Sequence, residues 1–207
     1  MTSNREHAFR EATWAATRAI ELDGADALSY AMRAAVVVNS GQIDRYLNAL
    51  SDARFAYEMN PNETMVLRTL AYLETVTGEP ERAIERLHQI TRLNPRDSHR
   101  HMSYNLLAFA SLGAKQYAEG IHWASCALND MPRLIPAYAN LAACLVGSGE
   151  IDKAKAAFAA GQKLAPEYFK AKLAGTLPLV REDHARQLTF LRIAAGLEDP
   201  SAAEALR

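Results

Sequence analysis

One short stretch of the sequence has residue types that could bind a metal ion. In "DSHRH", Asp97, His99 and His101 combine a carboxylate with two imidazoles, which are common zinc ligands. Two histidines that are two residues apart point to different sides of a helix, so they could converge only on an extended connection. Side chains of these types usually lie on the solvated surface. We therefore expect a solvated turn here, with no metal and no other cofactor.

A second pair of residues could form an activated thiol. His122 and Cys126 are four residues apart and would share one face of a helix. A nucleophilic cysteine also needs an electropositive setting and a third group that orients its base, and the sequence indicates neither. The sequence also has no glycine-rich phosphate loop, no HExxH and no GxSxG. We predict that the chain is not an enzyme and has no catalytic residues.

The overall composition is that of a folded and nearly neutral protein. Of its 207 residues, 49% are hydrophobic and 23% are charged, and the formal net charge is -1. Such a balance gives no electrostatic attraction to nucleic acid or to an anionic membrane. No stretch approaches the roughly 18 apolar residues that span a bilayer, and the N-terminus does not resemble a secretory signal. Two cysteines without a CxxC pair fit a reducing compartment. We expect a cytoplasmic protein that binds neither nucleic acid nor membranes.

A repeated spacing predicts the elements that position the side chains. Four prolines are separated by 34, 37 and 34 residues: Pro61, Pro95, Pro132 and Pro166. "GEPERAIERLHQITRLNP", which starts at Gly78, and "GEIDKAKAAFAAGQKLAP", which starts at Gly149, share a glycine, an alanine, a large apolar residue and a final proline at equal spacing. Glycine suits a helix C-terminus, alanine lets two helices approach closely, and proline stops the second helix. The pattern therefore predicts stacked pairs of antiparallel helices.

The spacing resembles that of the tetratricopeptide repeat (TPR), a helix-turn-helix unit of about 34 residues. The signature sites of one unit are Leu67, Leu70, Ala71, Gly78, Ala83, Leu87, Ile90 and Pro95, and those of another are Tyr138, Leu141, Ala142, Gly149, Ala154, Phe158, Gly161 and Pro166. The resemblance implies an all-α fold, a right-handed TPR superhelix of antiparallel helix pairs that ends in a capping helix.

We expect residues 1–207 to form a single TPR array. Its predicted parts are an unpaired leading helix at 3–24, repeats at about 27–63, 64–97, 101–134 and 135–168, and a C-terminal cap at 169–200. In the cap, Leu188, Leu191 and Ala195 lie on one side of an amphipathic helix. A leading helix without its partner leaves an apolar face uncovered, so we expect the natural protein to continue upstream of Met1.

The C-terminal tail is similar to the end of the TPR regions in bacterial class III adenylate cyclases and related winged-helix regulators. The shared features are, in order, Pro166, Phe169, "LAGTLPL", Glu182, Asp183 and "FLRIAAGLED". Leu179 stands where that group usually has phenylalanine, and Ile193 and Ala194 alter the usual ending. This resemblance implies the non-catalytic, C-terminal part of a bacterial signalling protein such as an adenylate cyclase. The alternative is a free-standing TPR adaptor or a self-associating scaffold.

The TPR resemblance implies a functional groove lined by the first helix of each pair. The usual groove positions correspond here to Met65, Arg68, Tyr72, Thr75, Met102, Asn105, Phe109, Asn140 and Ala143. Methionine and aromatic side chains beside amide and guanidinium donors suit an extended or helical peptide, although the same residues could instead pack against a neighbouring helix. The lysines of the carboxylate-clamp co-chaperones are not matched. We predict a non-catalytic interaction module that binds a protein or peptide segment in the groove, or associates with itself.

Overall fold

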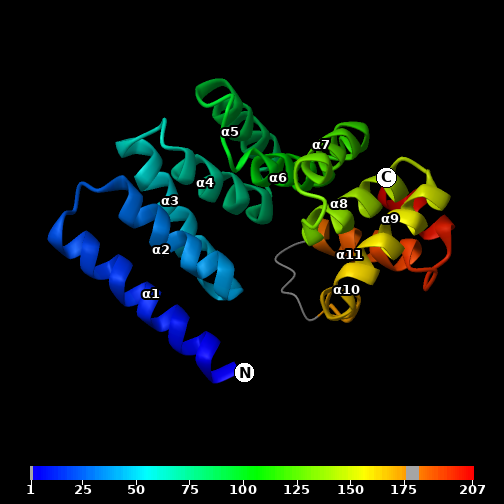
Figure 1. The fold of residues 1–207 in the computed structure, drawn as a ribbon, viewed down its shortest axis with the longest axis horizontal. Helices are drawn as coiled ribbons and strands as arrows, with labels where there is room; N and C mark the ends of the chain where they lie inside the picture. The colour runs from blue at the N-terminus through cyan, green and yellow to red at the C-terminus, as the bar shows by residue number, and fades with distance from the viewer. Residues whose placement is uncertain (1, 176–181) are drawn as a thin grey trace.

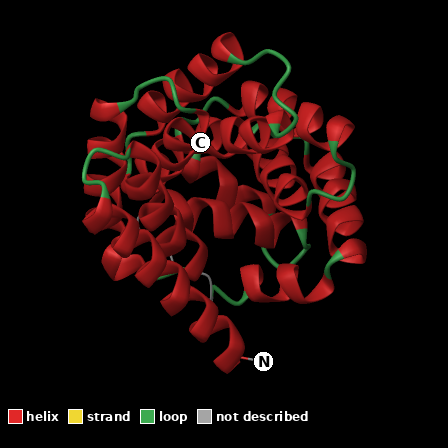
Figure 2. Ribbon diagram, turned by 60° about the vertical axis from the view of Figure 1, so that its left-hand side comes forward, coloured by secondary structure: helices red, strands yellow, loops and turns green. Residues whose placement is uncertain are grey.

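The computed structural model describes residues 2–175 and 182–207, and these residues form helices and no strand. In chain order the elements are α1 (Thr2–Leu22), α2 (Ala27–Ser40), the 3-10 helix η1 (Ile43–Arg45), α3 (Tyr46–Met59), α4 (Thr64–Thr77), α5 (Pro80–Leu93), α6 (Arg100–Gly113), α7 (Tyr117–Asp130), α8 (Ile135–Gly147), α9 (Ile151–Leu164), α10 (Pro166–Leu173), α11 (Glu182–Ala194) and the 3-10 helix η2 (Pro200–Leu206). Figure 2 shows this all-helical arrangement, and the predicted fold class is confirmed.

Consecutive helices pack in pairs that follow an arc. α2 packs with α3, α4 with α5, α6 with α7 and α8 with α9, and short connections make each pair antiparallel. The first helices also pack on one another, α2 on α4, α4 on α6 and α6 on α8, and we call these four helices the inner row. In Figure 1, α1 lies at one end of the arc and α10 and α11 lie at the other. The arrangement brings one face of each inner-row helix onto a shared surface.

A glycine lies at or just after the end of the first helix in three pairs, and two of these glycines, Gly78 and Gly149, were predicted from the spacing. Gly41, Gly78 and Gly149 have φ angles of 73°, 92° and 84°. This left-handed conformation strains residues that carry a Cβ, and it lets the amide of Gly78 donate to the carbonyl of Thr75 at 3.3 Å. In the α6–α7 turn the positive φ falls on Lys115, at 59°. The inner-row helices therefore end at defined points, which fixes their length.

The repeated alanines and large apolar residues form the core between the helices. Ala83 and Leu87 of α5 are buried with Leu67 of α4 and Leu107 of α6 in one cluster. Small residues on one helix and large ones on the next let the helices interdigitate at close range. The core therefore runs along the arc between the two rows of helices.

After α9 come α10, α11 and the 3-10 helix η2, in place of a further complete repeat. Pro166 lies in the first turn of α10, a position where proline's missing amide hydrogen costs nothing. α10 ends at Leu173, just before Gly175, which has a φ of 64°. Pro178, a second residue that would break a helix, lies outside the described residues, and α11 packs against α8 and α9. Within the described chain, none of the helices has both the length and the apolar character needed to cross a membrane.

Candidate functional site

Aromatic rings connect the middle of the inner row. The ring of Tyr72 on α4 lies 6.5 Å from that of Tyr46 and 6.0 Å from that of Phe109 on α6, measured between centroids. Burial raises the pKa of Tyr72 well above its usual range, with smaller contributions from Tyr46 and from Tyr168 of α10. Burial also raises the pKa of Tyr168, to about 12. Both phenols are therefore uncharged at neutral pH, and the rings of Tyr72 and Phe109 form an aromatic contact between α4 and α6.

Six of the nine predicted groove residues lie on α4 and α6 with part of their surface exposed, Arg68 among them. Met65, Tyr72, Asn105 and Phe109 are half-buried, and Met102 is 45% exposed. Thr75 differs, because it is buried and its hydroxyl donates to the carbonyl of Ala71 within the same helix, at 2.8 Å.

Arg68, predicted as a guanidinium donor in the groove, holds two helices together instead. Its Nη2 donates to a carboxylate oxygen of Asp97 at 2.6 Å, and its Nε donates to the hydroxyl of Ser103 at 3.3 Å. The side chains of Arg68 and Asp97 are only 14% and 8% exposed. Desolvation lowers the pKa of Arg68 and the charge of Asp97 opposes this shift. The guanidinium is thus already bound, and it fastens α4 to the α5–α6 connection.

The stretch whose residue types could bind a metal is a turn that leads into α6, and Asp97 has a structural role in it. Asp97 is buried and its carboxylate also accepts from the backbone amide of His99 at 2.9 Å, so the prediction of a solvated turn is wrong for this residue. The rings of His99 and His101 lie 6.3 Å apart. Among the residues that the structure describes, no three His, Cys, Asp or Glu side chains are grouped so that they could hold a metal ion.

The side chains of His122 and Cys126 are close, as their spacing indicates, but the electrostatics oppose activation of the thiol. Cys126 Sγ lies 3.7 Å from His122 Nε2. Burial, and to a smaller extent the charge of Asp130, raises the pKa of the Cys126 thiol. A raised pKa reduces the population of the nucleophilic thiolate. His122 and the neighbouring Trp123 instead make an edge-to-face ring contact, at 4.8 Å between centroids.

The last pair of predicted groove residues, Asn140 and Ala143 on α8, are covered by α11. Both are buried, and Ala143 shares a core cluster with Phe190, Leu191 and other α11 residues. Packing against a neighbouring helix, the alternative that the sequence left open, therefore describes these two positions. Only the α4 and α6 part of the predicted groove keeps exposed surface.

Polar contacts also join α11 to the inner row. Gln187 Nε2 donates to Asn140 Oδ1 at 3.2 Å, and Asn140 Nδ2 in turn donates to Asn105 Oδ1 at 3.0 Å. Arg186 Nη2 donates to the carbonyls of Leu112 and Gly113, at 2.9 and 2.7 Å, where α6 ends. Carbonyls at the end of a helix carry a partial negative charge, so a cation is favourable there. α11 therefore recognises both α8 and α6.

Sequence reasoning did not single out Arg186 and Gln187. The apolar side predicted for α11 consists of Leu188, Leu191 and Ala195. This prediction is only partly correct, because Leu188 and Ala195 are half-buried. The most buried apolar side chains of α11 are Phe190, Leu191, Ile193 and Ala194. Polar residues at the edge of an apolar stripe are usually assigned to the solvated face. The signal that could have found them is that Arg186 and Gln187 lie one turn before Phe190 and Leu191.

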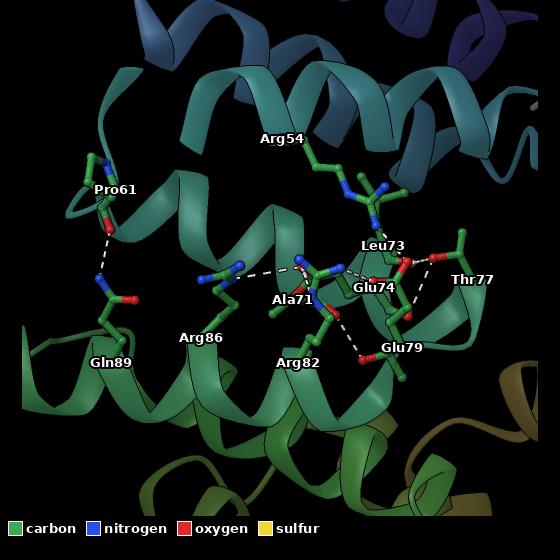
Figure 3. A network of polar contacts seen from close by, with 11 residues as sticks. Arg54, Pro61, Ala71, Leu73, Glu74, Thr77, Glu79, Arg82, Arg86 and Gln89 are labelled. Carbon is green, nitrogen blue, oxygen red and sulfur yellow. Dashed lines mark hydrogen bonds and ion pairs between the residues drawn. The ribbon is translucent and has the colours of Figure 1, made fainter. Parts of the chain in front are cut away.

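A buried carboxylate on α4 is a second feature that the sequence reasoning missed (Figure 3). Glu74 is fully buried, and neither of its carboxylate oxygens accepts a hydrogen bond from a described residue. Its nearest cationic atoms are Nε of Arg86 and Nε of Arg82, at 3.8 and 3.9 Å. Arg82 also binds Glu79, which accepts from Arg54 of α3 as well, at 2.5 Å. Desolvation raises the pKa of Glu74 above its usual value, and the charges of the neighbouring arginines offset only part of this rise.

Comparison with known proteins gives matches among solved structures. No protein-family model matches the chain, and no curated protein matches it by sequence. PilW, described as a widely conserved type IV pilus biogenesis factor, has a TM-score of 0.68 at 15% identity, covering 100% of this chain and 94% of its own. MamA (41-end) from Desulfovibrio magneticus RS-1 has a TM-score of 0.60 at 19% identity, covering 79% of this chain and 89% of its own.

A third match is YrrB, described as a TPR protein with an unusual peptide-binding site. Its TM-score is 0.55 at 20% identity, and the alignment covers 93% of this chain and 97% of that one. Sequence identities this low leave the function of the present chain open. The helix pairs, the glycine and proline spacing and these structural matches together show that the chain has the all-α TPR fold.

Proposed function

We propose that the chain is a non-catalytic interaction module that binds a protein segment on the inner row, at α2, α4 and α6. The observation that carries this proposal is a stripe of three apolar side chains at equivalent positions. Leu28, Met65 and Met102 are spaced 37 residues apart and each lies in the first turns of an inner-row helix. Leu28 and Met102 are 44% and 45% exposed. Exposed apolar residues in register on one surface are characteristic of interaction sites.

The chemistry of this surface suits a partner segment that has apolar side chains and few charged groups. Methionine adapts its shape to different partners, and the aromatic residues Tyr72 and Phe109 add rigid apolar area. Arg68 is bound to Asp97 and so does not select for acidic groups. The peptide-binding site named for YrrB supports the same assignment for a chain of this fold. We infer that the partner binds through apolar contacts more than through charge.

The proposal can be tested with a phage-displayed library of random peptides selected on the purified chain. Peptides that bind the inner row should lose about tenfold or more in affinity for the Met65→Glu/Met102→Glu variant, because a charge would be buried under the peptide. Met131→Glu is a matched control, since Met131 is 40% exposed but lies in the α7–α8 connection. Isothermal titration calorimetry gives both affinities. The proposal fails if selected peptides bind the double variant as well as they bind the wild type.

A finer proposal concerns the setting in which this module works. The order of features from Pro166 to Asp199 supports a place at the end of a cytoplasmic bacterial signalling protein such as an adenylate cyclase. The alternative is a free-standing adaptor or a self-associating scaffold. The reading frame upstream of Met1 distinguishes them: a cyclase or winged-helix domain in frame supports the first, and its absence supports the second.

A further inference from the structure

α11 is bound to the rest of the chain as a ligand helix would be bound in a groove. Its apolar side packs into the core cluster formed with α8, where Phe190, Leu191 and Ile193 are almost completely buried. The ring of Phe190 meets that of Tyr117, at the start of α7, edge-to-face at 5.9 Å. A helix whose anchors recur at intervals of one turn is the usual way in which a peptide helix fills a groove.

Two buried polar residues fix the position of α11 on this surface. Arg186 reaches the last carbonyls of α6, and Gln187 joins the amide chain of Asn140 and Asn105. Buried polar groups contribute little net stability, but they penalise every register that leaves them without partners. The surface is therefore selective for a helix that presents Arg and Gln one turn before Phe and Leu.

We propose that the surface formed by α8 and α9 with the end of α6, which we call the α6–α8 surface, is a helix-binding site. The chain fills this site with its own α11, and the site takes α11 of a second copy when the contact within the chain is weakened. The complementarity shown by Arg186, Gln187, Phe190 and Leu191 is present in every copy of the chain. Exchange of an identical element between two copies creates the same contacts again and needs no new surface. The α11 site does not include the stripe of Leu28, Met65 and Met102. The proposal for this site and the proposal for the inner row can therefore fail independently.

The helix attached to the chain has a large advantage over a free one. A tethered segment acts at an effective concentration in the millimolar range, so a free helix must compete against that value. In the wild-type chain we therefore expect the site to exclude a free copy of α11. A chain in which the attached α11 is weakened, and the α6–α8 surface is unchanged, should accept it.

The test uses a fluorescein-labelled synthetic peptide of residues 182–197 and fluorescence anisotropy. The Arg186→Glu/Gln187→Glu chain should bind the wild-type peptide about tenfold or more tightly than the wild-type chain does. The same chain should not bind a peptide with Arg186→Ala and Gln187→Ala. A peptide with Arg192→Ala is the matched control and should bind like the wild-type peptide, because Arg192 is exposed and its ion pair is with Glu198, which lies just beyond the peptide.

Hydrogen exchange and light scattering complete the test. In the double variant, the amides of α11 should exchange faster than in the wild type while those of α4 and α6 stay protected. By light scattering the double variant alone should stay monomeric, because the α11 of a second variant copy carries the same two changes and cannot fill the site either. Gln187→Ala alone is the milder variant if the double variant does not fold, and it should show the same changes to a smaller degree. The proposal is overturned if a folded variant with exposed α11 amides fails to bind the wild-type peptide. It is equally overturned if α11 remains fully protected in both variants.

Discussion

Among the single residues, Glu74 has the environment least suited to its side chain. It lies 37 residues after Val37 and 71 before Leu145, the same intervals that separate Gly78 from Gly41 and Gly149. Two other inner-row helices thus carry an apolar residue at this position. Glu74 is fully buried near Arg82 and Arg86, but at distances too long for hydrogen bonds. The charged form loses its hydration without full compensation, which is the physical cause of its raised pKa.

Glu74→Gln should therefore change the pH dependence of stability. Because the folded-state pKa lies above the usual value of 4.5, the contribution of this carboxyl is greatest at pH values below 4.5 and is lost as the pH rises through the folded-state pKa. Glutamine cannot ionise, so the melting temperature of the variant should increase relative to the wild type as the pH rises above 4.5. Thermal unfolding followed by circular dichroism between pH 4 and pH 8 measures this difference.

Glu79→Gln is the matched control and should show the opposite trend. Desolvation opposes ionisation of Glu79 too, but its hydrogen bonds with Arg82 and Arg54 outweigh this, so its pKa is lowered. Its contribution is present above the usual value of 4.5 and is lost as the pH falls through the lowered pKa. The variant should lose stability relative to the wild type as the pH rises toward 4.5, so its thermal unfolding is also followed below pH 4. If both variants follow the wild type in parallel at all pH values, the assignment of these two shifts is wrong.

At the scale of helices, Gly120 explains a departure from the repeat pattern. It stands where a TPR usually has alanine, and a Cβ built on it would lie 2.4 Å from Cys144 Sγ. Cys144 is fully buried on α8, and its thiol lies 3.9 Å from the carbonyl of Ala108 on α6. The sulfur thus occupies the space that alanine fills elsewhere. The contact between α7 and α8 is therefore built from a matched pair of residues.

Gly120→Ala should destabilise the chain by about 1–3 kcal/mol, the usual cost of forcing an extra methyl group into a packed core. Cys144→Ala removes the sulfur and should reduce that cost markedly when the two changes are combined. Urea denaturation of the two single variants and the double variant forms a double-mutant cycle. If the effects of the two changes are simply additive, the clash with Cys144 is not what excludes a side chain at position 120.

The sequence predicted the helices far better than it predicted the site. Glycine, alanine and proline act through local geometry, so Gly78 and Ala83 could be placed from spacing alone. Arg68 could not, because its partner Asp97 lies 29 residues away in a turn that sequence reasoning assigned to solvent. Asn140 and Ala143 were predicted correctly as first-helix positions. The path of α11 over them depends on contacts such as Arg186 to Leu112, 74 residues apart, which no local pattern encodes.

The two ends of the whole molecule are unequal. At one end, α1 packs on α2 and leaves Trp14 67% exposed. At the other end, α10, α11 and η2 cover α8 and α9. In a repeat array each unit is stabilised mainly by its neighbours, so a helix with a neighbour on one side opens more easily.

We therefore expect the backbone amides of α1 to exchange with deuterium before those of α8. Mass spectrometry of exchange on the native chain, at a pH and temperature where the chain is fully folded, measures both helices in one experiment. α9 is an internal control. Like α1 it lies outside the inner row, but it has α10 and α11 packed on it. Equal protection of α1 and α8 would mean that the array opens as one cooperative unit.

The bonds from Arg186 to the end of α6, and from Gln187 to the middle of α8, also limit how the array can change in length. One helix contacts two successive pairs at once, so inserting a pair between them would separate the two sets of acceptors by the width of a repeat, and deleting either pair would remove one set. Gain or loss of a unit is compatible with this tail only before α6. α11 thus fits only the two pairs that precede it, α6–α7 and α8–α9. A chimeric array that uses α11 as its last helix would need both of these pairs with it.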